Sequence, residues 1–228
     1  MSTPLTPTTP SGPGHPADRR FSAADRLIGS ADQALRTLAG AATASRPYPA
    51  DNVGETITES ADRRRIGALM RVNHAGEVAA QALYQGQACV ARSEPLRESL
   101  LAAGREEVDH LNWCSRRLGE LGMRVSVLDP LWYAGSFAMG MLAGLAGDRI
   151  SLGFVGETER QVAAHLQDHL RQLPAEDART RAIIEQMHAD EERHGSAAMS
   201  AGGASLPALA RTAMQFTATI MKHTASRI

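Results

Sequence analysis

Two short segments of this chain place a glutamate three residues before a histidine. The first pair is Glu107 and His110, and the second pair is Glu191 and His194. Side chains three residues apart point the same way on an α-helix. The repeated spacing therefore predicts two helices, each with a carboxylate and an imidazole on one face.

A single glutamate precedes each pair by a length suited to one helical hairpin. Glu77 lies 30 residues before Glu107, and Glu159 lies 32 residues before Glu191. The sequence thus contains an internal repeat of two hairpins with the same groups. Two helix-borne glutamates and two inward Glu-x-x-His pairs are typical of ferritin-like di-iron and di-manganese bundles.

The predicted ligands fall on otherwise apolar helical stripes. Glu77, for example, shares a stripe with Ile66 and Met70 at helical steps. A glutamate on a helix is usually a solvated surface residue, but an unpaired carboxylate in the interior costs several kcal/mol. Because no Lys or Arg falls on these stripes near the ligands, two divalent cations are the economical source of neutralising charge.

We therefore predict a dinuclear metal site. Its ligands are Glu77, Glu107, His110, Glu159, Glu191 and His194. Glu107 and Glu191 are expected to bridge the two ions, Glu77 and Glu159 to be terminal, and each histidine to bind one ion. Carboxylates with one imidazole per metal suit iron or manganese, and no cysteine is placed to favour structural zinc. No catalytic residue is assigned beyond these ligands.

Neighbouring residues are weaker candidates. Glu106 and Asp190 each precede a bridging glutamate, and we expect each to accept a hydrogen bond from the opposite histidine. Glu157 is the alternative to Glu159, but it falls off the apolar stripe of its helix. Tyr84 shares the stripe of the first ligand helix; it is either a core residue, which is favoured, or a residue that contacts the ligands.

The rest of the pattern predicts an all-α protein with one domain. The chain has 228 residues, which suits one domain, and its formal net charge of −1 argues against a nucleic-acid partner. We expect a Pro- and Thr-rich disordered tail at 1–20 and a single ferritin-like domain at 21–228. The four-helix bundle is expected to carry an additional N-terminal helix, an apolar crossover helix and a C-terminal helix. The expected helices are 21–38, 62–92, 95–121, 131–145, 153–173, 175–200 and 206–223.

The crossover segment is the most apolar part of the chain. Between Val125 and Gly147 the only charge is Asp129. The 18 residues from Pro130 to Gly147 are at the short end for spanning a bilayer. Its glycines and aromatic opening favour an interfacial helix that packs on the bundle and touches the membrane through residues 131–147.

The cysteines and the N-terminus indicate the compartment. Cys89 and Cys114 have the spacing of neither a metal site nor a disulfide framework, so a reducing cytosolic compartment is expected. The N-terminus lacks the apolar region of a secretory signal peptide.

The chain resembles the demethoxyubiquinone hydroxylase family, the di-iron monooxygenases of ubiquinone biosynthesis, over about residues 22–228. The run that ends at Glu77 is specific, since a generic ferritin would not be expected to show it. The family pattern also favours Glu159 over Glu157. The motifs that carry the resemblance are Asp25-Arg26-Leu27-Ile28, Ala34-Leu35-Arg36-Thr37-Leu38, Arg71-Val72-Asn73-His74-Ala75-Gly76-Glu77, Glu107-Val108-Asp109-His110-Leu111, Pro130-Leu131-Trp132 and Asp190-Glu191-Glu192-Arg193-His194.

The resemblance implies two iron ions per subunit and O2 as co-substrate. The implied reaction hydroxylates the ring of a polyprenylated methoxy-benzoquinol, in the penultimate step of ubiquinone biosynthesis. The implied location is the cytoplasmic side of the bacterial inner membrane, as a peripheral protein. A homo-oligomer or a complex of ubiquinone-biosynthesis proteins is compatible with it. Electrons must come from outside or from the quinol, because the sequence contains no flavin or nicotinamide motif.

The ligand set alone also fits other classes of protein. A ferritin-like iron-binding protein or ferroxidase is the main alternative, although a soluble ferritin shell would not need the apolar crossover segment. A radical-generating reductase subunit would need a tyrosine near the metals, and of the three tyrosines only Tyr84 lies on a ligand helix. A manganese catalase would be distinguished by metal analysis and a peroxide assay.

Overall fold

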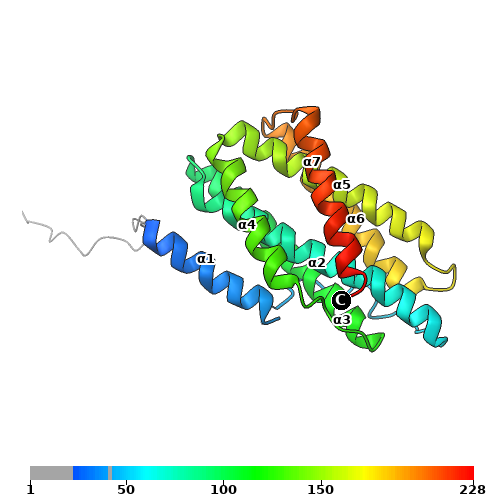
Figure 1. Cartoon of the computed structure of the whole chain (residues 1–228). Helices are drawn as coiled ribbons and strands as arrows, with labels where there is room; N and C mark the ends of the chain where they lie inside the picture. Colours follow the sequence, from blue (N-terminus) through cyan, green and yellow to red (C-terminus); the bar gives the residue numbers. More distant parts are fainter. Residues whose placement is uncertain (1–22, 41–42) are drawn as a thin grey trace, which may run out of the picture.

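A computed structural model describes residues 23–40 and 43–228, and these residues form helices joined by irregular connections (Figure 1). The tail predicted at 1–20 lies outside them. The expected all-α architecture is confirmed. The helices are α1 (Ala23–Leu38), α2 (Ser60–Val90), α3 (Glu94–Glu120), α4 (Asp129–Leu145), α5 (Asp148–Gln172), α6 (Ala178–Ser200) and α7 (Ala208–Ala225).

The ferritin-like bundle consists of two hairpins. Helix α2 packs along α3, and α5 packs along α6, as Figure 1 shows. Their facing stripes enclose a core that includes Ile66, Met70, Trp113, Ile184 and Met187, none of which is more than 2% exposed. Burying a side chain of this size contributes about 1.5–3 kcal/mol. The apolar stripes therefore both hold the bundle together and turn the predicted ligands inward.

Local sequence explains where several helices begin. Pro95 lies in the first turn of α3, where a missing N–H costs no intrahelical bond. Asp177 caps α6 by accepting the backbone N–H of Thr180 at 3.0 Å. Helix α5 begins at Asp148 rather than near residue 153 as predicted. The reason is Gly147, whose φ of 110° turns the chain directly from α4 into α5.

Helix α4 lies against α2 at very short range because both helices carry glycine at the contact. A Cβ at Gly86 of α2 would overlap the carbonyl oxygen of Phe137, and a Cβ at Gly140 of α4 would overlap that of Leu83. Two helical backbones can approach this closely only where no side chain intervenes. The position of α4 along α2 is thereby fixed.

Helices α1, α4 and α7 expose several large apolar side chains. In the view of Figure 1, α4 runs between α1 and α7. Among the residues that the structure describes, no helix combines the length and the apolarity needed to cross a bilayer. The large apolar side chains of these three helices that are more than half exposed are Ile28, Leu35, Leu131, Leu142, Leu145, Leu209 and Phe216.

Buried polar contacts fasten the N-terminal elements to the bundle. Thr37 of α1 donates a hydrogen bond to Gln81 of α2 at 2.7 Å. Arg117 of α3, which is fully buried, pairs with Glu55 at 2.5 Å and with Asp177 at 3.3 Å. Arg117 therefore joins the segment before α2 to the start of α6.

Candidate metal centre

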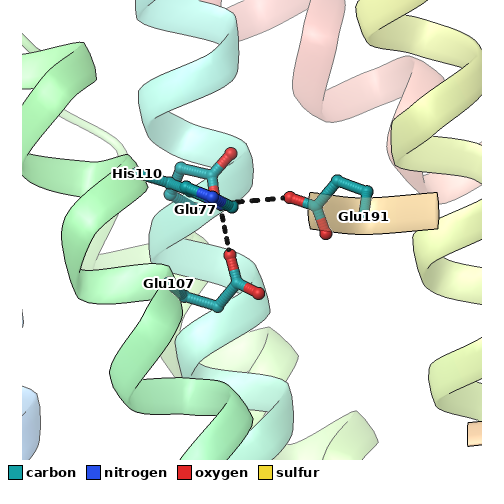
Figure 2. A group of neighbouring side chains, drawn as sticks. All are labelled: Glu77, Glu107, His110 and Glu191. Carbon is teal, nitrogen blue, oxygen red and sulfur yellow. Dashed lines mark hydrogen bonds and ion pairs between the residues drawn. The ribbon is translucent and has the colours of Figure 1, made fainter. Parts of the chain in front are cut away.

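Four of the six predicted ligands meet at the centre of the bundle. Glu77 comes from α2, Glu107 and His110 come from α3, and Glu191 comes from α6 (Figure 2). One ligand atom from each lies within 4.8 Å of the others. None of these side chains is more than 2% exposed. The bundle thus brings three carboxylates and an imidazole together away from water.

His110 is the centre of this group. Its Nδ1 lies 2.9 Å from Glu107 Oε2, 3.2 Å from Glu191 Oε1 and 3.7 Å from Glu77 Oε2. Figure 2 shows Glu191 reaching the imidazole from the opposite hairpin. Nδ1 is therefore the nitrogen of His110 that could bind a metal together with these carboxylates.

His194 and Glu159 adjoin the group from the second hairpin. His194 Nδ1 lies 3.1 Å from Glu107 Oε1 and 3.7 Å from Glu191 Oε2. Glu159 is 1% exposed and lies close enough to Glu191 that the charge of Glu191 raises its pKa. Glu107 and Glu191 consequently each contact both histidines, as expected for the two carboxylates predicted to bridge.

The outward nitrogens of the two histidines bind carboxylates from the opposite hairpin. His110 Nε2 lies 3.0 Å from Asp190 Oδ2, and His194 Nε2 lies 3.2 Å from Glu106 Oε2. The structure thus contains the cross-pairing predicted from the sequence. Such partners orient the imidazole ring and select the tautomer that leaves Nδ1 free to bind a metal.

Arg46 extends this outer layer and was not predicted. Its Nη1 contacts Asp190 Oδ2 at 2.8 Å, and its Nε contacts Asp109 Oδ2 at 2.7 Å. The guanidinium also lies 4.8 Å from the centre of the Trp113 ring. Arg46 belongs to the irregular segment before α2, where no helical periodicity could indicate its destination.

Glu157 and Tyr84 each have polar partners in the structure. Glu157 pairs with Arg160 at 2.7 Å and accepts a hydrogen bond from Gln161, whereas Glu159 is buried beside Glu191. Tyr84 is a core residue, as predicted. Its hydroxyl also donates to Glu159 Oε1 at 2.5 Å, so Tyr84 adjoins the predicted ligands as well.

Burial and proximity shift the pKa values of the site in opposite directions. Burial raises the pKa of Glu77 and of Glu159 well above 4.5, and the charges of Glu107 and Glu191 add to this effect. Burial lowers the pKa of His194, but the nearby carboxylates of Glu107 and Glu191 outweigh this effect and raise that pKa to about 11. Near neutral pH, protons thus neutralise part of the negative charge, and a bound cation would displace them.

The residues present fit a pair of divalent ions. Four buried atoms of the predicted ligands have no hydrogen-bond partner among the described residues: Glu107 Oε1, Glu159 Oε2, Glu191 Oε2 and His194 Nδ1. The 3.1 Å approach of His194 Nδ1 to Glu107 Oε1 is an ion-pair distance without hydrogen-bond geometry. Carboxylate and imidazole donors suit iron or manganese. Cys114 is a poor competing ligand, because burial raises the pKa of its thiol.

An open cavity of about 810 Å³ reaches this site between α2, α4, α5 and α7. Glu77 forms part of its wall. Much of the remaining wall is apolar, with Leu83 and Phe154 among its residues, and it includes Leu131 and Trp132 of α4. The cavity therefore joins the exposed apolar side of α4 to one of the predicted ligands.

Comparison with known proteins identifies one family. The sequence model of the family described as "Ubiquinone biosynthesis protein COQ7" matches residues 64–225. A "3-demethoxyubiquinol 3-hydroxylase" from Verminephrobacter eiseniae is 53% identical over 205 residues, which cover 90% of this chain and 99% of the relative. A protein of the same name from Cupriavidus necator is 56% identical over 206 residues, which cover 90% of this chain and 100% of the relative. In agreement with the resemblance seen in its motifs, this chain belongs to the COQ7 family of ubiquinone biosynthesis proteins.

Proposed function

We propose that this protein is a 3-demethoxyubiquinol 3-hydroxylase, a di-iron monooxygenase that uses O2 to hydroxylate the ring of a polyprenylated methoxy-benzoquinol. Its relatives carry that name. The observation that carries the proposal is the buried carboxylate and imidazole cluster at the wall of an open apolar cavity. A ferroxidase would have no use for a cavity suited to a large organic molecule, so that alternative is not favoured.

In this proposal the bundle binds the metals and orients their ligands. The residues that would hold two iron ions are Glu77, Glu107, His110, Glu159, Glu191 and His194. Bound iron supplies the activation of O2. Asp190 and Glu106 fix the orientation of the two histidines, and Tyr84 holds Glu159 through its hydroxyl. Burial of the cluster limits access of water.

The cavity is the route that we propose for the quinol. Its volume of about 810 Å³ lies within the usual range of ligand pockets, roughly 300–1,000 Å³. Its apolar wall suits an aromatic ring with the first part of a polyprenyl chain. Because Glu77 lines the cavity, a ring bound there lies next to the metal centre.

We infer that the protein meets the substrate at a membrane surface. A polyprenyl tail leaves a bilayer only at high cost. Residues 131–147 expose Leu142, Leu145 and Leu131, and Leu131 also lines the cavity. Phe216 of α7 is also exposed and would extend this surface. The location that fits is the cytoplasmic side of the bacterial inner membrane, with residues 21–228 acting as one domain, alone, as a homo-oligomer or in a biosynthetic complex.

Complementation with a lipid readout tests the function. The chain is expressed in a bacterium without its own 3-demethoxyubiquinol 3-hydroxylase, and ubiquinone is quantified against its precursor. We expect the wild type to restore ubiquinone and Glu107→Ala and Glu191→Ala to abolish it. Glu192→Ala is the matched control, because Glu192 is a solvent-exposed neighbour on α6 with 66% of its side chain accessible. A wild-type protein that binds two irons without restoring ubiquinone would contradict the proposal and favour an iron-storage or peroxide role.

A further inference from the structure

Asn73 has an unusual environment for a buried amide. It lies on α2 one helical turn before Glu77, and both residues line the same cavity. Asn73 is only 3% exposed. Asn73 Oδ1 has no hydrogen-bond partner among the described residues, and Nδ2 donates only to Met70 Sδ, at 3.8 Å. Oδ1 itself is buried, but sulfur is a weak acceptor, so the amide can turn toward the cavity without breaking a strong hydrogen bond.

Three other polar side chains of the cavity wall are engaged elsewhere or lie farther from the predicted ligands. Thr158 donates to the carbonyl oxygen of Phe154 at 2.9 Å, and Gln161 donates to Glu157 at 2.6 Å. His165 Nε2 is also unpartnered, but His165 lies six residues beyond Glu159, about 9 Å along the helix axis.

The chemistry of the ring indicates what this amide could recognise. A quinol carries O–H donors, whereas the oxidised quinone carries only carbonyl acceptors at the same positions. An unpartnered carbonyl oxygen of the amide therefore matches the reduced ring and is left without a donor by the oxidised ring.

We propose that Asn73 selects the quinol over the quinone and orients its ring. This inference rests on the proposed function. Oδ1 accepts a hydrogen bond from one ring O–H, and Nδ2 donates to the adjacent ring oxygen. Because Asn73 is one turn from Glu77, this contact fixes which edge of the ring faces the metal centre. Asn73 is thus a specificity-determining residue that acts on the substrate directly.

Equilibrium binding without turnover tests this role. Purified full-length protein is titrated under argon with a short-chain methoxy-methyl-benzoquinol and with the corresponding quinone. The fluorescence of Trp132, which lines the cavity, reports occupancy. In the wild type we expect the quinol to bind about three- to tenfold more tightly than the quinone, the effect of one net hydrogen bond. Asn73→Leu is expected to weaken quinol binding by that factor and to remove the preference.

Two further variants make the result specific. Asn73→Asp keeps the size and an acceptor oxygen, and we expect it to keep the preference for quinol. Asn112→Leu removes an amide of α3 that donates to the carbonyl oxygen of Val108 and lies outside the cavity, so both affinities should stay at wild-type values. Equal quinol preference in wild type and Asn73→Leu, or its loss in Asn73→Asp, overturns the inference. Absence of any binding to the wild type would instead contradict the proposed function.

Discussion

Replacing Asp190 with Asn should weaken one of the two metal sites. Asp190 Oδ2 binds His110 Nε2 at 3.0 Å and Arg46 at 2.8 Å, and Oδ1 binds Arg193 at 2.9 Å. Loss of such a partner to a ligating histidine typically costs 10- to 100-fold in metal affinity, or about 1.4–2.7 kcal/mol. Because Arg46 and Arg193 are partly exposed, at 31% and 52%, we expect a smaller loss of folding stability than for a fully buried pair.

Anaerobic titration with ferrous iron against a chromophoric chelator measures this effect. The expected result is one weakened site and one site near the wild-type affinity. Asp168→Asn, which removes an exposed carboxylate on α5 paired with Arg171, should leave both sites unchanged. Glu106→Gln should affect the other site by a smaller factor, because the Glu106 side chain is 41% exposed. Two wild-type affinities in Asp190→Asn would refute the role assigned to the pairing with His110.

Three other changes have defined outcomes. Arg117→Met should lower the free energy of unfolding by about 3–5 kcal/mol, because it leaves the buried carboxylate of Asp177 without its charged partner. Arg171→Met removes an exposed pair and should change that free energy little; urea denaturation compares the two variants. Burial lowers the pKa of His169 from 6.5 to about 4. As the pH falls from 6.5 toward 4, this imidazole is protonated in the unfolded chain but not in the folded protein, so the free energy of unfolding decreases. Between pH 7.5 and 5.5, the free energy of unfolding of His169→Gln should therefore fall by about 1.4 kcal/mol less than that of the wild type. Equal decreases, measured by thermal unfolding at the two pH values, would contradict the lowered pKa of His169. Leu142→Ser combined with Phe216→Ser should reduce flotation with liposomes, and unchanged flotation would place the membrane contact elsewhere.

The helices and the clustering of the predicted ligand residues could be predicted, because both depend on local periodicity. Glu107 and His110 could be placed on one face from spacing alone, and the second hairpin repeated the pattern. The pairing of Asp190 with His110 was also predictable, since an imidazole ligand needs an acceptor and the repeat indicated which carboxylate could supply it.

Contacts that depend on the path of irregular chain could not be predicted. Arg46 reaches Asp190 from a segment without periodicity, and only the packing of that segment against the bundle determines the contact. The hydroxyl of Tyr84 on α2 contacts Glu159 on α5, and the sequence does not encode how closely these two helices approach. The early start of α5 depends on the φ value of Gly147, which the sequence permits without requiring it.

The glycine contact between α2 and α4 has a consequence for measuring how the protein sits on a lipid surface. Gly86 and Gly140 leave no space for α4 to slide or rotate against α2, which carries Glu77. The distance between the outward side of α4 and Glu77 is therefore fixed. A depth probe, such as a spin label at Leu142, would report the height of Glu77 above the lipid, and any widening of the cavity must come from α5 or α7 on the opposite wall.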